Sequence, residues 1–133
     1  MCSEEFEARR KSSSGLMEWL GRGASPLRVH WVDGSAMAPT LRPGDAVFVL
    51  PTTCYEGEGI YLVEDGGDVP SLFRAMTGAS REDIRLSFDA APHSAFTMPR
   101  DRFNERVLGL VVAELRVTQP SKARKALGAS RTP

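Results

Sequence analysis

The chain has few cysteines and histidines. It contains two cysteines, Cys2 and Cys54, which are too few and too far apart for a disulfide framework or a Cys-x-x-Cys metal site. We therefore expect both to be free thiols. It contains only two histidines, and no spacing brings them onto one face with a carboxylate. These shortages argue against a metal centre, and no cofactor is expected.

Long apolar segments are also missing. No run approaches the roughly 20 residues that a membrane span needs, and the acidic start of the chain is unlike the basic beginning of a secretory signal. We therefore expect a cytoplasmic protein without a membrane partner. A hydrophobic content of 41% in 133 residues is enough for one folded domain.

Lysine is nearly absent from the middle of the chain, since the only three are Lys11, Lys122 and Lys125. The balanced total charge hides an asymmetry: residues 118–133 carry a net +4 and the remainder a net −4. A basic tail of this kind can contact nucleic acid or an acidic partner. We favour the simpler interpretation of a solvated, flexible terminus.

What the chain does contain is a series of short β-type segments. Residues 27–31 and 84–88 alternate apolar and polar side chains, whereas residues 46–50, 59–63 and 107–115 are mostly apolar. Residues 64–68 form a strong turn signal, which predicts a hairpin with a return strand at 72–76. The fold class expected is mostly β: a compact barrel or sandwich with a short N-terminal helix or arm.

The most specific segment runs from Gly34 to Asp45, with the sequence Gly-Ser-Ala-Met-Ala-Pro-Thr-Leu-Arg-Pro-Gly-Asp. A strand that meets glycine can turn sharply, and a proline and a Pro-Gly-Asp turn then lead into the next strand. Such a loop presents free backbone N–H groups, which suits a nucleophile beside an oxyanion hole. The segment resembles the nucleophile loop of the LexA/UmuD-like serine peptidases, whose fold is shared with signal peptidases. The matching residues are Gly34, Ser35, Met37, Pro39, Thr40, Gly44 and Asp45.

The resemblance implies a Ser-Lys dyad, and both members are replaced. The family's nucleophilic serine precedes the Met, where this chain has Ala36. The family's lysine precedes an Arg on the return strand of the hairpin; with Arg74 matching that Arg, the lysine position is Phe73. An engineered Ser-to-Ala variant would explain Ala36 alone, but the second loss favours a natural pseudoprotease. The Ala-Gly or Cys-Gly bond that such proteins cut in themselves also occurs nowhere in the chain.

Two other catalytic arrangements fit the sequence less well. Ser35 lies one residue from the nucleophile position, so its side chain should point away from the same cleft. His30 or His93, oriented by Asp33 or Asp89, would give a Ser-His-Asp site, which we rank far below packing or surface histidines.

The resemblance covers about residues 29–116 and divides the chain into an arm or short helix at 1–26, a peptidase-like domain at 27–117 and the basic tail at 118–133. It implies a homodimer formed through the closing strand, with Val107, Leu108, Leu110 and Val112 as candidate contacts. It also implies a regulatory, protein-binding role in SOS, phage or transcriptional control. The expected partner is a LexA-like repressor, a recombinase filament or another regulator. The alternatives are an active or engineered self-cleaving peptidase and a nucleic-acid-binding accessory protein that uses the tail.

Overall fold

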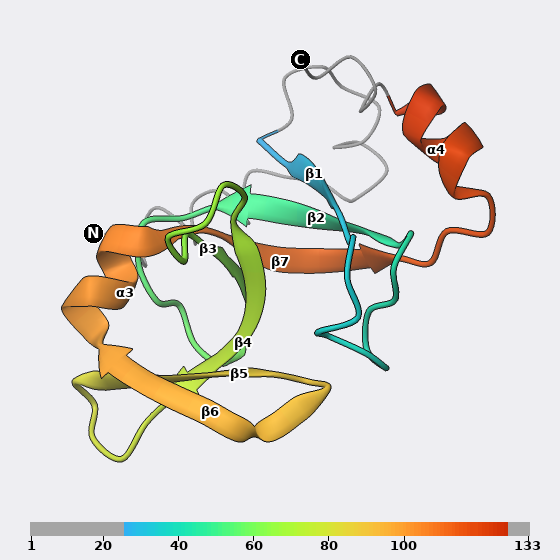
Figure 1. The fold of residues 1–133 in the computed structure, drawn as a ribbon. Helices are drawn as coiled ribbons and strands as arrows, with labels where there is room; N and C mark the ends of the chain where they lie inside the picture. Colours follow the sequence, from blue (N-terminus) through green and yellow to red (C-terminus); the bar gives the residue numbers. More distant parts are fainter. Residues whose placement is uncertain (1–25, 128–133) are drawn as a thin grey trace.

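The computed structural model describes residues 26–127, and it confirms the mostly β fold class. The described part contains seven strands and two helices (Figure 1). In chain order they are β1 (Arg28–Trp31), β2 (Ala46–Pro51), β3 (Gly59–Val63), β4 (Ser71–Thr77), β5 (Asp83–Phe88), β6 (Ala91–Pro99), α3 (Arg100–Arg106), β7 (Val107–Leu115) and α4 (Pro120–Ala126). The predicted arm or helix within residues 1–26 lies almost entirely outside the described residues.

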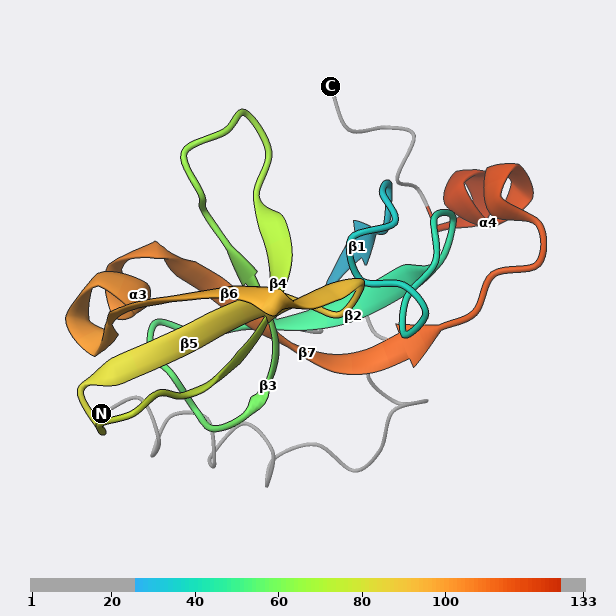
Figure 2. The same ribbon diagram turned by 60° about the horizontal axis from the view of Figure 1, so that its bottom comes forward.

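The strands form one antiparallel sheet in the order β1-β2-β7-β3-β4-β5-β6. Figures 1 and 2 show that this sheet is strongly curled, with β5 and β6 turned away from the β1–β2–β7 end. The last strand, β7, lies between β2 and β3 and joins the two halves. All six strands expected from the sequence are present, and β6 is an additional one.

Side chains on opposite faces of β3 and β4 build two apolar clusters, because successive residues of a strand point to opposite faces. Tyr61 and Phe73 belong to one cluster, together with Phe103 from α3. Ile60 and Leu72 belong to the other, which also contains residues of β2 and of the segment between β1 and β2. The second cluster positions the candidate site.

Two expectations fail in the described part. Cys54, in the connection between β2 and β3, is disulfide-bonded, so the prediction of a free thiol is wrong there. The basic tail was expected to be flexible, but Pro120 is the first residue of α4. Its fixed φ and missing N–H suit the first turn of a helix. Residues 120–126 of the predicted flexible tail are therefore helical.

Candidate functional site

The site is built on the loop that joins β1 to β2. Two backbone hydrogen bonds close the base of this loop: Val32 N–H donates to Asp45 O at 2.9 Å, and Gly44 N–H donates to Val32 O at 2.8 Å. Met37 and Leu41 are buried in the second cluster and anchor the loop to the sheet. Ala36 is exposed at the tip. The loop therefore holds Ala36 outward on a fixed backbone.

Gly44 and Asp45 serve the shape of this loop. The carboxylate of Asp45 accepts hydrogen bonds from the backbone N–H of Arg42 and of Val117, both at 3.1 Å. Gly44 has φ +95°, a conformation that residues with a Cβ rarely adopt. A Cβ at Gly44 would also approach Pro120 Cγ to 3.1 Å. Both motif residues thus tie the loop to the segment after β7.

Thr40 and Arg74 are brought together through Asp89, a residue that the sequence suggested only as a partner for histidine. The Asp89 carboxylate accepts hydrogen bonds from Arg74 Nε at 2.7 Å, from Arg74 Nη2 at 2.9 Å and from Thr40 Oγ1 at 2.5 Å. The hydrogen bonds from Arg74 and Thr40 hold the pKa of Asp89 below its usual range. We call Thr40, Asp89 and Arg74 the carboxylate bracket. It links the loop, strand β4 and the β5–β6 turn.

The backbone of the β5–β6 turn supports the loop directly. Ala90 N–H donates to Ala36 O at 2.9 Å. The backbone N–H groups of Ser35, Ala36 and Met37, by contrast, make no hydrogen bond to any residue within 26–127. In the described part of the chain, the exposed residues Ser35 and Ala36 therefore keep N–H donors without an acceptor, whereas Met37 is buried.

Phe73 lies on the face of β4 opposite to Leu72 and is buried, with 4% of its surface exposed. Its ring stacks on Phe88 with centroids 4.8 Å apart and meets the edge of Phe96 at 5.9 Å. Phe88 in turn borders the groove beside Ala36. Phe73 is thus separated from the groove by one aromatic ring, and no lysine stands at this position.

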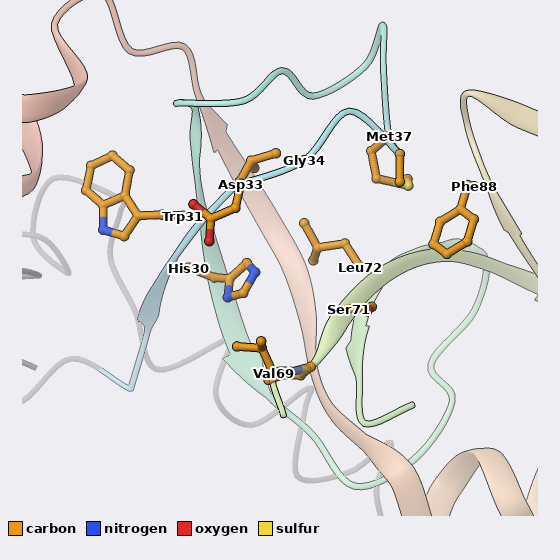
Figure 3. A pocket seen from close by; sticks show the side chains of 12 residues that line it. His30, Trp31, Asp33, Gly34, Met37, Val69, Ser71, Leu72 and Phe88 are labelled. Atoms are coloured by element: carbon orange, nitrogen blue, oxygen red, sulfur yellow. The ribbon is translucent and has the colours of Figure 1, made fainter. Parts of the chain in front are cut away.

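A groove of about 270 Å³ lies between the loop and the tip of the β3–β4 hairpin (Figure 3). Ala36, Met37 and Asp33 border it on the loop side, and Leu72 and Val69 border it on the hairpin side. Most of these walls are apolar. Ser35 does not line the groove.

The structure gives little support to a Ser-His-Asp catalytic site. His30 and Asp33 line the groove, but burial lowers the pKa of His30, and the opposing influence of Asp33 is the smaller one. Ser71, which also lines the groove, donates its hydroxyl to Asp65 at 2.6 Å. His93 lies on β6 and is exposed. Within residues 26–127 no group of three or more His, Cys, Asp or Glu side chains could hold a metal ion.

The candidate dimer residues of β7 fall into two pairs. Val107 is buried in the first cluster, and Leu110 packs against it. Leu108 and Val112 are 39% and 40% exposed. The register places Val107 to Leu110 beside β3 and Gly109 to Leu115 beside β2. Only Leu108 and Val112 of the four therefore present apolar surface outward.

The predicted basic tail makes specific contacts where the structure describes it. Arg124 of α4 forms an ion pair with Asp33, and its guanidinium lies over the Trp31 ring. Sequence reasoning missed this contact, although Pro120 at the helix start was a usable signal. No helix among the described residues is long and apolar enough to cross a membrane.

The comparisons relate part of this chain to a phage regulator. The 26 kDa repressor protein of Escherichia phage HK022 is 42% identical to it over 43 residues. Those residues are 32% of this chain and only 18% of the repressor, so the chain spans less than a fifth of that relative's length. No protein-family model matches the chain. The likeness suggests a regulatory relationship, and the antiparallel β-fold is compatible with it.

Proposed function

We propose that this protein is a catalytically inactive LexA/UmuD-like pseudoprotease that acts as a dimeric, regulatory protein-binding module. One observation supports the proposal above all: the β1–β2 loop is held by several hydrogen bonds, and its tip carries Ala36 where the peptidases have their nucleophilic serine. The carboxylate bracket and the Asp45 hydrogen bonds hold the loop in place. Ala36, at the nucleophile position, has no atom that could attack a carbonyl group.

The groove suits an extended peptide segment. The N–H group of Ala36, which makes no hydrogen bond within residues 26–127 and borders the groove, can donate to a peptide carbonyl oxygen, which accepts such a bond when a strand docks. Apolar walls from Leu72 and Val69 can bury one of the peptide's side chains. Without a nucleophile and a base, the bound segment would be held and not cut.

The segment held there is the protein's own residues 1–26 or a stretch of a partner, such as a LexA-like repressor or another regulator in SOS, phage or transcriptional control. Dimerisation would use the outward side chains of β7, Leu108 and Val112. Direct nucleic-acid binding by the tail ranks lower, because Arg124 is already paired with Asp33.

A photo-crosslinking experiment tests the groove. Val69 lines the groove and is 67% exposed, so replacing it with p-benzoylphenylalanine places a crosslinker at the groove with little cost to the core. Phe96, 46% exposed on β6 and outside the groove, is the matched control position. We expect Val69 to crosslink in the native host to one defined peptide segment, identified by mass spectrometry. Equal crosslinking from both positions, or none from Val69, would contradict a peptide-binding groove.

A further inference from the structure

Helix α4 packs against the loop that carries Ala36 instead of extending away from the sheet. Just before the helix, Val117 N–H donates to the Asp45 carboxylate at 3.1 Å. The first helical residue, Pro120, lies so close to Gly44 that a Cβ there would be 3.1 Å from its ring. The start of α4 is thus fitted to the end of the loop.

Arg124 contacts the beginning of the same loop. Its Nη2 lies 2.9 Å from Asp33 Oδ1, and its guanidinium carbon lies 4.8 Å from the centroid of the Trp31 ring. Figure 2 shows α4 on the side of the molecule where β1 and the loop lie. A planar guanidinium suits both contacts at once, because it forms hydrogen bonds in its plane and stacks on a ring with its face. Trp31 and Asp33 immediately precede Gly34, where the loop turns toward Ala36.

Helix α4 buries little surface within the described structure. None of the residues of α4 is buried, and a helix of seven residues is not stable in water by itself. The Asp33 side chain is 79% exposed, so its ion pair with Arg124 is screened by salt. A helix held in this way can dock and release at low cost.

We propose that α4 is a strap that holds both ends of the loop, and that Arg124 is a positioning residue that fixes the first end and thereby the N–H donors at the tip. With the strap docked, the loop presents its donors in one arrangement; with the strap released, the loop between Trp31 and Asp45 samples others. The consequence for ligand binding depends on the proposed function, since it assumes that the groove takes a peptide. The effect on the loop itself does not.

Hydrogen exchange on the intact chain without any ligand tests the strap. The Arg124→Ala variant should raise the exchange rate of the backbone amides of Val32 and Gly44, whose hydrogen bonds close the base of the loop, by about fivefold, the effect of removing roughly 1 kcal/mol of surface ion-pair and cation–π contact. Amides in the β4–β5 pairing, such as that of Ala75, should keep their rates. Arg124→Lys should give an intermediate rate, since a lysine keeps the charge and loses the planar geometry. Lys125→Ala, a neighbouring change in the same helix, is the matched control.

A second readout uses Trp31, which becomes the single tryptophan in a Trp19→Phe background. Its emission should shift to longer wavelength with salt, and the salt dependence should vanish in Arg124→Ala. Unchanged exchange at Val32 and Gly44 in Arg124→Ala, or an equal rise in Lys125→Ala, would overturn the strap. Because neither measurement involves a ligand, a failure here is distinct from a failure of the crosslinking test at Val69.

Discussion

The carboxylate bracket offers the sharpest test of how the loop is held. Asp89 is only 12% exposed and accepts three hydrogen bonds, two of them from the Arg74 guanidinium. Hydrogen bonds to charged groups contribute about 1.5–3 kcal/mol when buried. Because Arg74 is 31% exposed and Thr40 is exposed, we take the lower end. Asp89→Asn should lower the free energy of unfolding by about 2 kcal/mol, which corresponds to roughly 6–10 °C in Tm for a chain of this size.

A double-mutant cycle separates the interaction free energy between Arg74 and Asp89 from the other effects of each substitution on stability. The variants are Arg74→Met, Asp89→Asn and the combination, with unfolding followed in urea by far-UV circular dichroism. We expect a coupling free energy of about 1–1.5 kcal/mol, since the double variant leaves no unpaired charge behind. Additivity of the two single changes within about 0.3 kcal/mol would refute the reasoning that these side chains act together.

The bracket also predicts a pH dependence with a definite sign. The folded-state pKa of Asp89 is below its ordinary value of 3.8, mainly because of Arg74. The carboxylate therefore contributes stability that is fully present above that value and is lost as the pH falls through the lower folded-state pKa. The stability difference between the wild-type protein and Asp89→Asn should be constant from pH 7 to 5 and should shrink below about pH 4.

Three further predictions concern the loop tip, the dimer and the turn. Phe73→Lys should lower the free energy of unfolding in urea by about 3 kcal/mol or more, because it buries an amine where an aromatic ring packed. Ala36→Ser, at the exposed tip, should change the free energy of unfolding by less than about 0.5 kcal/mol. Only the double variant could regain trans cleavage of a linker peptide, since nucleophile and base act as a unit. Val112→Lys should convert the proposed dimer to a monomer in sedimentation equilibrium, while Val29→Lys, at an equally exposed valine on β1, should leave the mass unchanged. Gly44→Ala should lower the free energy of unfolding by more than 1 kcal/mol through its positive φ and the approach to Pro120, and a change below 0.3 kcal/mol would contradict that account.

The sequence predicted the strands that carry their own local signals. The β3–β4 hairpin follows from the turn at residues 64–68, and β5 follows from its alternation. Strand β6 was missed because Pro92 and several polar residues obscure its pattern. It lies at the edge of the sheet, where the missing N–H of a proline is tolerated. Its strand conformation therefore depends on pairing with β5 and not on its own composition.

The candidate site could be predicted in part. The loop from Gly34 to Asp45 was recognised from its motif, and the structure places Thr40 and Arg74 in one bracket. The residue that joins them, Asp89, was not predicted in that role because its partners lie 15 and 49 positions away in the sequence. Its position depends on the β4–β5 register, which pairs Arg74 with Ser87 and thus brings the following turn to the arginine.

The position of β7 has a consequence for the order in which the molecule can form. Within the described chain, β1 pairs with β2, and β2 pairs on its other side with β7. Strands β3 to β6 form a meander that is joined to β2 in the sheet only through β7. On a ribosome β1 and β2 emerge long before β7, which follows β6 after only the short helix α3, and the long-range pairing of β2 with β7 is a slow step in folding. A nascent chain that stops before residue 107 contains the residues on both sides of the groove but lacks β7, the strand that joins the two parts of the sheet. The proposed peptide-binding groove therefore forms only after β7 has been synthesised.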